Sequence, residues 1–321
     1  MSGTTRPDVA IHFDGVVKHY GDVRALDGLS LEVPHGRMFG LIGPDGAGKT
    51  TAIRVVCGLL RADSGSVRVL GHDPIREHRA IAQSVGYLSQ RFSLYGDLSV
   101  DENIAFFAEI HGVRRYAARR DRLLEMTQLT PFRGRLADRL SGGMKQKLAL
   151  ACTLIHEPRL IVLDEPTTGV DPVSRREFWK LLSEFLELGI TILVTTPYLD
   201  EAERCARVAL LHAGRVIAAD APDVLRAGLP GRLIEVVTDN AERVADIVPD
   251  VPGVDDVQLF GTRAHVRVMD APAEETLEHI RQQLSSAGIA PRSIRFIPAT
   301  LEDVFIARLA AHEAMPTPPV S

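Results

Sequence analysis

Short apolar runs alternate along most of the chain with segments whose apolar residues fall at helical spacing. The strand-length runs that consist mainly of apolar residues are 39–42, 85–89, 160–165 and 190–195. Continuous apolar runs of this length are typical of strands buried on both faces of a parallel sheet. Because helical segments lie between them, the pattern predicts an α/β fold.

Four other segments near the N-terminus also have the residue pattern of strands. They are 9–13, 16–20, 29–33 and 66–70. We expect the first three to be edge strands that precede the central strand at 39–42. From about 91 to 155 the pattern is helical instead, most clearly at 101–110 and 117–129, which predicts a helical subdomain inserted in the α/β fold.

A different pattern begins after a group of Gly and Pro residues that follows position 228. It predicts strands at 233–237, 257–259, 265–268 and 293–297, and helices at 241–247 and 273–287. We interpret 1–228 as one domain and 233–310 as a small α+β domain, with Thr300 as a suitable N-cap of its final helix. The proline-containing end, 311–321, is expected to be disordered.

Composition narrows the class of protein. The chain has 321 residues, 45% hydrophobic and 25% charged, and at about 150 residues per domain this length predicts two domains. The formal net charge of -5 argues against broad binding of nucleic acid. We expect no membrane span, because no apolar run approaches about 18 residues, and no secretory segment after Met1. Cys57, Cys152 and Cys205 lie far apart in apolar patterns, which predicts reduced thiols in the cytoplasm.

The turn after the run at 39–42 carries the first candidate chemistry. Its residues are Gly43, Pro44, Asp45, Gly46, Ala47, Gly48, Lys49, Thr50 and Thr51. This is the pattern of a phosphate-binding loop: a glycine, four further residues and then Gly-Lys-Thr. In such a loop backbone N–H groups surround the phosphates of a nucleotide. Lys49 would reach the β- and γ-phosphates, and the Thr50 hydroxyl would hold Mg²⁺. The strand before the turn and the amphipathic helix after it favour nucleotide binding over a chance glycine turn.

Two further positions are candidates for ligand contact. Tyr20 stands before a Gly-Asp turn, where its ring is either a stacking surface for a base or a half-buried side chain of a strand. Gln90 follows the strand at 85–89, and ligands of α/β folds bind at the carboxyl ends of the strands. A solvated strand end is the alternative interpretation of Gln90.

A second anion site is predicted at the start of a later helix. Its residues are Ser141, Gly142, Gly143, Met144, Lys145 and Gln146, and apolar residues follow at helical intervals. Ser141 is a natural N-cap, and the two glycines expose backbone donors at the positive end of the helix. A simple capped helix would have the same pattern.

Two adjacent carboxylates, Asp164 and Glu165, end the apolar run at 160–165. Side chains alternate along a strand, so the two point in different directions and take different roles. Asp164 would bind Mg²⁺, and Glu165 would orient or deprotonate an attacking water. Unpaired buried carboxylates are costly, so we prefer a functional role for both.

In this order, the motifs resemble those of the ATP-binding subunits of ABC transporters, over roughly Val9 to Leu225. The resemblance implies a P-loop ABC-ATPase core with ATP and Mg²⁺ as cofactors. It implies that Tyr20 stacks on adenine and that Gln90 senses Mg²⁺ and contacts the membrane subunit. The implied catalytic residues are Glu165, Gln90 and Lys49, and the implied metal ligands are Thr50, Gln90 and Asp164.

In proteins of this family two ATPase units pair head to tail. The resemblance implies that each ATP is held between the phosphate loop of one unit and the signature sequence, Ser141 to Gln146, of the other. Asp171 would lie near the junction of the two units. Binding closes the pair and hydrolysis reopens it, which converts chemistry into motion. The helical subdomain would dock on cytoplasmic helices of a membrane partner.

One position departs from the family pattern. The family has a histidine at the γ-phosphate after the strand at 190–195, and Pro197 stands in its place. Pro197 offers no imidazole and no backbone N–H, and a hydroxyl from Thr195 or Thr196 would substitute more weakly than a charged donor. We therefore hypothesise pairing with a different ATPase subunit, and a homodimer that tolerates the loss is the alternative. Asp45, where the family commonly has asparagine, adds a negative charge near the phosphates.

The C-terminal domain carries a second resemblance. Its string Leu-Glu-Asp-Val-Phe at 301–305 resembles the C-terminal extension of drug- and antibiotic-exporter ATPases that work with ABC-2-type membrane subunits. This implies an efflux motor at the cytoplasmic face of the membrane, with separate membrane subunits as partners and no nucleic acid. The alternatives are a soluble ABC ATPase acting on nucleic acid or ribosomes and an ATP-binding regulatory subunit with little hydrolysis. The transported substrate is not encoded in these residues.

Overall fold

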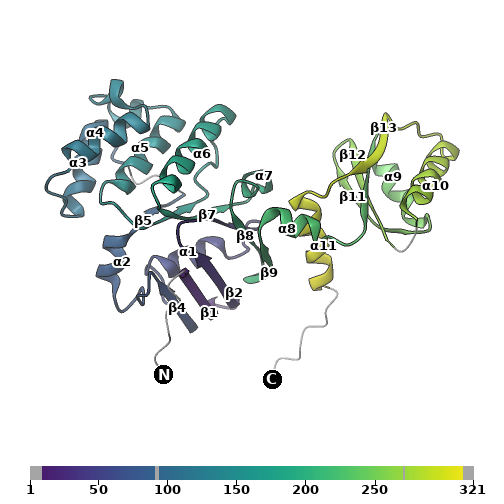
Figure 1. The fold of residues 1–321 in the computed structure, drawn as a ribbon, viewed down its shortest axis with the longest axis horizontal. Helices are drawn as coiled ribbons and strands as arrows, with labels where there is room; N and C mark the ends of the chain where they lie inside the picture. The colour runs from purple at the N-terminus through teal and green to yellow at the C-terminus, as the bar shows by residue number, and fades with distance from the viewer. Residues whose placement is uncertain (1–8, 91–93, 270–271, 314–321) are drawn as a thin grey trace. The chain divides into compact units, whose positions relative to one another are not determined.

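The computed structural model describes residues 9–90, 94–269 and 272–313 (Figure 1). The chain divides into two compact units, Met1–Pro222 and Asp223–Ser321, and each is described by itself.

The first unit is built on a six-stranded sheet. In spatial order its strands are β5 (Val85–Leu88), β6 (Leu160–Asp164), β7 (Thr191–Thr196), β3 (Met38–Ile42), β8 (Arg207–His212) and β9 (Arg215–Asp220). Neighbouring strands are parallel from β5 to β8, and β9 is antiparallel to β8. Every residue of β3, β6 and β7 is buried, so the predicted α/β fold is confirmed. The carboxyl ends of these three strands therefore lie side by side.

A separate antiparallel sheet contains the segments that we expected as edge strands. Its strands are β2 (Val23–Pro34), β1 (Val9–Tyr20) and β4 (Ser64–Val69), in that spatial order. The prediction of two strands at 9–13 and 16–20 was wrong, because both belong to β1. A register shift between Phe13 and Val16, with Gly15 at a φ of 58°, takes up an extra residue without ending the strand.

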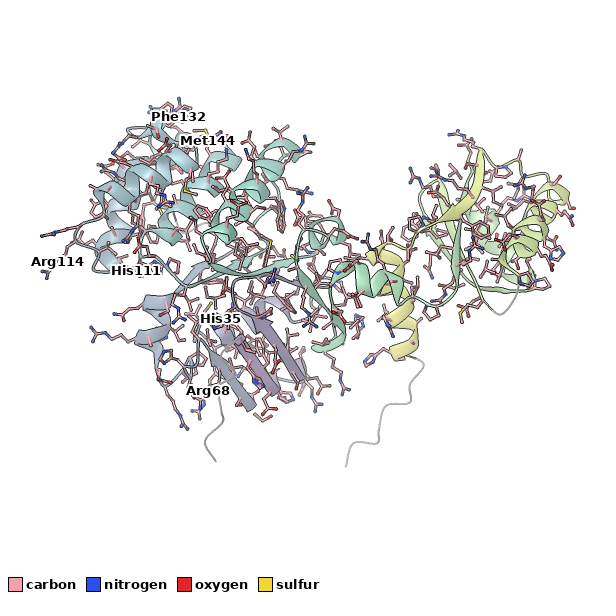
Figure 2. All side chains as sticks on the ribbon, viewed as in Figure 1. His35, Arg68, His111, Arg114, Phe132 and Met144 are labelled. Atoms are coloured by element: carbon pink, nitrogen blue, oxygen red, sulfur yellow. The ribbon has the colours of Figure 1, made fainter. Side chains whose placement is uncertain are left out.

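Seven α-helices belong to the described part of this unit, with two short 3₁₀ turns. They are α1 (Lys49–Val56), α2 (His78–Ser84), α3 (Val100–Ile110), α4 (Ala117–Met126), η1 (Thr130–Phe132), η2 (Ala137–Arg139), α5 (Gly142–Leu154), α6 (Pro172–Glu187) and α7 (Leu199–Ala202). Helix α3 begins at Val100 because Ser99 and Glu102 form a capping box. Helices α3, α4 and α5 lie together, and Arg114 extends outward from the connection between α3 and α4 (Figure 2).

One apolar core connects the two sheets of the first unit through α1. It includes Phe13 of β1, Leu29 of β2, Leu41 of β3, Ile53 of α1 and Val162 of β6, all fully or almost fully buried. Each such side chain contributes about 1.5–3 kcal/mol on burial. Since α1 begins in the phosphate loop, this packing fixes the loop relative to the carboxyl ends of β3 and β6.

The second unit is a four-stranded antiparallel sheet with helices. Its strands, in spatial order, are β11 (Val254–Phe260), β12 (Arg263–Val268), β10 (Arg232–Val237) and β13 (Ser293–Ile297). Its helical segments are α8 (Pro222–Ala227), which begins at the boundary of the units, α9 (Ala241–Ile247), η3 (Val248–Asp250), α10 (Ala273–Ser286) and α11 (Leu301–Glu313). Ile280 and Leu284 of α10 pack with Val236 and Val266 in its core. This unit has the α+β composition expected from the sequence.

The last helix, α11, is longer than the sequence analysis predicts. It continues to Glu313, so residues 311–313 are helical, whereas the disordered tail was predicted to begin at 311. Alanines at 310 and 311 have high helix propensity, and the first proline occurs at 316. Residues 314–321 lie outside the described part of the chain.

The three cysteines are buried and free of disulfides, as predicted for Cys57, Cys152 and Cys205. Burial raises the pKa of the Cys205 thiol to about 12. Within residues 9–90, 94–269 and 272–313, no helix has both the length and the apolar character needed to cross a bilayer.

Candidate nucleotide-binding site

The predicted phosphate loop connects β3 to α1 at the carboxyl edge of the parallel sheet. Gly48 is the N-cap of α1 and has a φ of 104°, in the region that favours glycine. A Cβ atom at Gly48 would overlap the carbonyl oxygen of Ala25, and one at Gly43 would overlap that of Leu211. Neighbouring backbone therefore surrounds the loop so closely that larger residues at these two positions do not fit.

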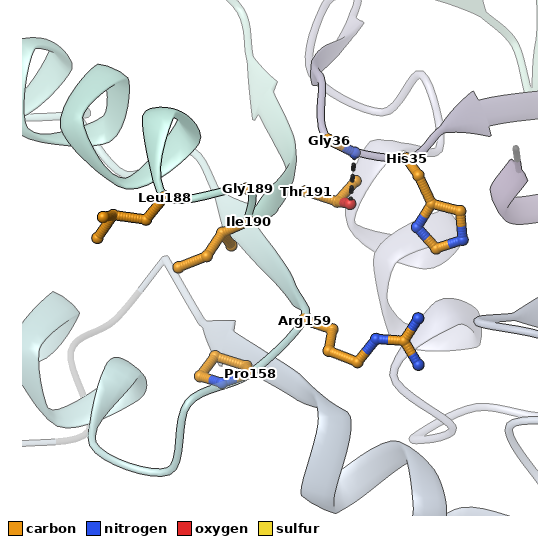
Figure 3. A pocket seen from close by; sticks show the side chains of 8 residues that line it. All are labelled: His35, Gly36, Pro158, Arg159, Leu188, Gly189, Ile190 and Thr191. Atoms are coloured by element: carbon orange, nitrogen blue, oxygen red, sulfur yellow. Dashed lines mark hydrogen bonds between the residues drawn. The ribbon is translucent and has the colours of Figure 1, made fainter.

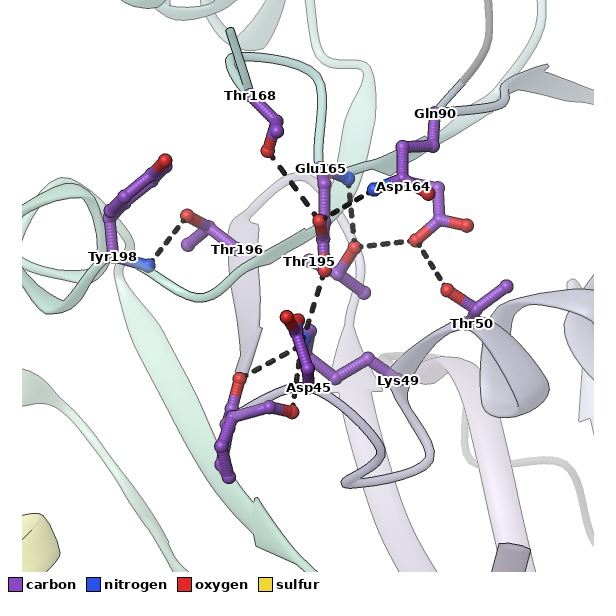
Figure 4. A network of polar contacts seen from close by, with 12 residues as sticks. Asp45, Lys49, Thr50, Gln90, Asp164, Glu165, Thr168, Thr195, Thr196 and Tyr198 are labelled. Carbon is purple, nitrogen blue, oxygen red and sulfur yellow. Dashed lines mark hydrogen bonds and ion pairs between the residues drawn. The ribbon is translucent and has the colours of Figure 1, made fainter.

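Lys49 is buried in the centre of the loop, with 4% of its side chain exposed. Its ammonium group donates to the carbonyl oxygens of Gly43 at 2.8 Å and Pro44 at 3.0 Å. It also lies 3.2 Å from Oε1 of Glu165. These three contacts use the three N–H bonds of the ammonium group and hold it where the phosphates of a nucleotide would enter (Figure 4).

Glu165, the residue after β6, has a backbone φ of 48°, which is unusual for a residue other than glycine. Its N–H donates to Thr195 Oγ1 at 3.0 Å, and its Oε2 accepts from Gln90 Nε2 at 2.9 Å. A non-glycine residue in this conformation costs on the order of 1–3 kcal/mol, and such strain clusters at functional sites. The local backbone and its hydrogen bonds thus aim the carboxylate at Lys49 and Gln90.

Asp164 is the last residue of β6. Its side chain contacts different partners from those of the Glu165 side chain, as the alternation of side chains along a strand predicts. It accepts from Thr50 Oγ1 at 3.1 Å and from Thr195 Oγ1 at 2.9 Å. Burial raises the pKa of the Asp164 carboxyl, although the two hydroxyl donors oppose this. A buried carboxylate next to a hydroxyl oxygen is a donor set that suits a hard divalent cation, so the residues fit Mg²⁺.

The two threonines before Pro197 donate their hydroxyls to carboxylates. Thr195 donates to Asp164, and Thr196 Oγ1 donates to Oε2 of Glu201 at 2.6 Å. The first amide after the proline, Tyr198 N, donates to Thr196 Oγ1 at 3.0 Å. Both hydroxyls considered as substitutes for the family's histidine are therefore engaged by carboxylates in this structure.

The start of α5 has the predicted cap, since Ser141 Oγ accepts from the N–H of Met144 at 3.3 Å. A Cβ atom at Gly142 would meet no atom within 4 Å, so this end of the helix is open. Gln146 differs from the rest of the signature sequence, because it is fully buried and donates to the carbonyl of Pro166. It therefore anchors α5 to the segment after Glu165 and presents no exposed surface.

The remaining predicted residues lie at exposed places of the first unit. Asp171 is the N-cap of α6, and its Oδ1 accepts from the N–H groups of Val173 and Ser174, each at 3.0 Å. Hydrogen bonds from Ser174 and Val173 lower the pKa of the Asp171 carboxyl. Tyr20, at the end of β1, is 46% exposed, which leaves its ring face accessible. Asp45 is 97% exposed, with its Oδ1 4.0 Å from the ammonium of Lys49.

The sequence analysis missed one cluster beside the site, formed by Thr167, Arg175 and Glu201. Glu201 is 1% exposed and accepts from Thr167 Oγ1 at 2.6 Å. Its helix, α7, has only four residues, so it shows no helical periodicity that would separate a buried acid from its exposed neighbours.

A pocket of about 400 Å³ lies at the opposite edge of the same sheet (Figure 3). It is lined by residues that include His35, Pro158, Arg159 and Ile190, near the amino ends of β6 and β7. Ligands of α/β folds bind at the carboxyl ends of the strands. The pocket is therefore distinct from the candidate nucleotide site.

Comparison with known proteins agrees with this geometry. A family model described as ABC transporter matches residues 26–168. The chain is 40% identical over 307 residues to the daunorubicin resistance ATP-binding protein DrrA3 of Streptomyces coeruleorubidus, covering 93% of this chain and 95% of that protein. It is 39% identical over 305 residues to the probable multidrug ABC transporter ATP-binding protein YbhF of Escherichia coli K12, covering 93% of this chain and 52% of YbhF. The chain thus spans about half the length of YbhF.

A solved structure supports the same assignment. The chain resembles cbiO1 from Clostridium perfringens, described as part of the ABC transporter complex cbiONQ, with a TM-score of 0.63 and 29% identity. The match covers 69% of this chain and 92% of cbiO1. The chain therefore belongs to the ATP-binding subunits of ABC transporters and is related to the DrrA and YbhF ATPases.

Proposed function

We propose that this chain is the ATP-hydrolysing motor subunit of an ABC-2-type exporter whose membrane subunits are separate chains. The observation that carries the proposal is the convergence of Lys49, Thr50, Asp164 and Glu165 at the carboxyl ends of β3 and β6, which lie on either side of β7. A phosphate-binding lysine, two oxygen ligands for a metal and a carboxylate base are the groups that phosphoryl transfer to water requires.

In this proposal the phosphates of ATP occupy the loop and take over the contacts of Lys49. Its ammonium exchanges the carbonyls of Gly43 and Pro44 for phosphate oxygens, which are stronger acceptors because they are charged. The N-terminus of α1 adds its positive dipole and free N–H groups. The exposed ring of Tyr20 stacks on adenine.

Thr50, Asp164 and Gln90 would hold Mg²⁺, which neutralises charge on the β- and γ-phosphates. Glu165 orients and deprotonates the attacking water. Gln90 donates to Glu165 at 2.9 Å, so its amide fixes the carboxylate until the metal and nucleotide arrive. Gln90 then contributes to catalysis by releasing and orienting Glu165.

The open N-terminus of α5 completes the site of a second ATPase unit. ABC ATPases of this family pair, and in this proposal the open Gly142, next to the Ser141 cap, offers its N–H to a partner's phosphates, while Gly143 is buried against Ser174. Met144 and Lys145 belong to the same turn and are half-buried, and Asp171 lies at the junction. The signature sequence therefore acts in the partner's site and not in its own.

Pro197 favours a partner that is a different ATPase subunit. No hydroxyl replaces the missing histidine, because Thr195 and Thr196 donate to Asp164 and Glu201. The site of this chain then binds ATP and turns over slowly, while its α5 completes a faster site on the partner. A homodimer that tolerates Pro197 is the second candidate, favoured by the intact Glu165.

The test is ATP hydrolysis across a series of protein concentrations, with Glu165→Gln as the inactive control and ATP binding measured alongside. Turnover that rises cooperatively with concentration and is lost in Glu165→Gln supports a homodimer. ATP binding without turnover, restored by a second ATPase subunit, supports the heteromeric pair. Absence of ATP binding overturns the proposed function.

The exported substrate class follows from the relatives and not from the site. DrrA3 and YbhF are named for daunorubicin resistance and multidrug transport, which supports drug efflux at the cytoplasmic face of the membrane. Cell fractionation tests whether the chain works with membrane subunits, because the chain should then sediment with membranes only when those subunits are co-expressed. Association with ribosomes or DNA would instead favour a soluble ABC ATPase.

A further inference from the structure

Glu201 of α7 is a buried carboxylate that was not among the predicted site residues. Its Oε1 accepts from Thr167 Oγ1 and its Oε2 from Thr196 Oγ1, each at 2.6 Å. Thr167 comes two residues after Glu165, and Thr196 directly precedes Pro197. One side chain thus bridges the segment after β6 and the segment after β7, with one oxygen for each.

Arg175 of α6 supplies a positive charge to this bridge. Its Nε lies 3.4 Å from Glu201 Oε1, and its guanidinium carbon lies 4.7 Å from the centre of the Tyr198 ring. The N–H of Arg175 also donates to the carbonyl of Asp171, the N-cap of the same helix, at 2.9 Å. Glu201 is therefore joined to the helix that begins at the proposed dimer junction.

The end of β7 reaches β6 through two consecutive hydroxyls. Thr195 donates to Asp164, which also accepts from Thr50 in the phosphate loop. Thr196 points to the other side of the strand, as alternation requires, and reaches Thr167 through Glu201. These contacts connect the end of β7 to the phosphate loop on one side and to Thr167 on the other.

A purely stabilising role does not account for this arrangement well. Buried ion pairs are often no more stabilising than well-packed apolar residues of the same size, because desolvation offsets the attraction. What the carboxylate provides here is two directional acceptors, one for each segment. Apolar side chains would not fix the relative positions of two loops in this way.

We propose that Glu201 is a positioning residue that couples the nucleotide-facing end of β7 to the segment 167–171 at the dimer junction. It acts through Thr167 and Thr196 and does not touch the nucleotide. This coupling rests on the proposed ATPase function, and it supplies a rigid connection at the place where Pro197 has replaced the family's histidine.

The test compares Glu201→Gln with Asp200→Asn, an exposed neighbour that loses the same charge. Glutamine keeps the size of the side chain, but it presents an acceptor oxygen to only one of the two hydroxyls and loses the charge that faces Arg175, so the connection between the two segments is weakened. We expect kcat to fall about 10-fold, as for loss of residues that orient catalytic groups. The KM for ATP, the ATP affinity and the melting temperature should stay near the parent values, and Asp200→Asn should change none of them.

A second pair of variants separates coupling from stability. Thr167→Val removes the hydroxyl at nearly constant shape and should lower kcat like Glu201→Gln, whereas Thr167→Ser keeps the hydroxyl and should keep the activity. The double variant Glu201→Gln/Thr167→Val should be no worse than either single variant. Additive losses, or a fall in kcat that follows a fall in melting temperature, would overturn the proposal.

Pairing driven by ATP in the Glu165→Gln background provides a readout that needs no hydrolysis. Adding Glu201→Gln should weaken this pairing while ATP binding is kept, and unchanged pairing together with unchanged kcat would overturn the coupling. A parent chain that binds ATP and pairs but never turns over, with or without a partner subunit, would contradict the proposed hydrolysis alone. The two failures are therefore distinguishable.

Discussion

The ammonium nitrogen of Lys49 lies 3.2 Å from Oε1 of Glu165, and both side chains are buried. The group proposed to bind phosphate and the group proposed to activate water are thus paired with each other. Phosphate entering the loop competes for Lys49, and the released carboxylate is then free to contact a water. The ion pair therefore links the filling of the loop to the position of the base.

Replacing the Glu165 carboxylate should separate the binding of ATP from its hydrolysis. In Glu165→Gln the negative charge near the phosphates is gone and Lys49 loses its competing partner, so we expect ATP to bind at least as tightly as in the parent. Hydrolysis should fall by about 10²–10⁴-fold, the usual contribution of a general base. Equilibrium binding of ATP and phosphate release measure the two effects. Loss of ATP affinity in Glu165→Gln would show that the carboxylate organises the loop instead.

Removing the lysine should also affect folding. Lys49→Met leaves Glu165 as a buried charge without its cation, and breaking a buried ion pair costs about 3–5 kcal/mol. The double variant Lys49→Met/Glu165→Gln removes both charges and should recover most of that loss, although it will not bind ATP. Chemical denaturation of the three variants measures this coupling. Equal stability of Lys49→Met and the parent would mean that water, not Lys49, solvates the carboxylate.

Asp164 gives a dependence on pH with a defined sign. Burial raises the pKa of its carboxyl, so the folded protein binds this proton more tightly than the unfolded chain does. Above the raised pKa, the ionised carboxylate lowers the free energy of unfolding. This destabilisation is relieved as pH falls through the raised pKa, because the carboxyl then becomes neutral. Without Mg²⁺, Asp164→Asn should raise the melting temperature at about pH 7.5, and the gain should shrink as pH falls toward the ordinary carboxyl pKa of 3.8.

The control for this prediction is Asp45→Asn, because Asp45 is 97% exposed in the same region. It should leave the melting temperature unchanged. Adding Mg²⁺ with nucleotide should then stabilise the parent more than Asp164→Asn, since only the parent retains the charged ligand. A lower melting temperature for Asp164→Asn at about pH 7.5 would contradict the prediction.

The sequence predicts the parts of the fold that depend on local pattern. The apolar runs predict β3, β6 and β7, because burial on both faces of a parallel sheet removes the polar alternation. It does not predict that β1 is one strand in a separate sheet, because a bulge at Gly15 interrupts the pattern without ending the strand.

The same distinction holds for the candidate site. The glycine-rich loop and the adjacent acids are found because their chemistry depends on residue type and spacing. Glu201 is not found, because its role depends on Thr167 and Thr196, which are distant in sequence or lie on another element. The position of Gln146 is missed for a similar reason, since its contact with Pro166 exists only after α5 packs near the segment that follows β6.

The second unit has a hydrogen bond between a histidine and a carboxylate that attaches its last helix to its sheet. Nδ1 of His265 on β12 lies 2.7 Å from Oδ1 of Asp303 on α11, and Oδ2 of Asp303 accepts from the N–H and the hydroxyl of Thr300. Burial by itself raises the pKa of Asp303, but the hydrogen bonds from His265 and Thr300 outweigh it and the net pKa is lowered. Asp303 is therefore stabilising as the anion.

Replacing this anion should loosen α11. A hydrogen bond to a charged group contributes about 1.5–3 kcal/mol, so Asp303→Asn should destabilise the second unit by this order at neutral pH.

The pH dependence of this stabilisation has a defined sign. A lowered pKa gives stability that is complete above the ordinary pKa of 3.8 and is lost as pH falls through the pKa of the folded state. The difference in stability between Asp303→Asn and the parent should therefore narrow as pH falls below 3.8. His265→Ala removes the other partner of this hydrogen bond and should destabilise the second unit as Asp303→Asn does. Its control is His279→Ala, because His279 is an exposed histidine on α10. Hydrogen exchange of α11 amides in the full chain measures the effect, and equal protection in Asp303→Asn and the parent at neutral pH would show that apolar packing alone holds the helix.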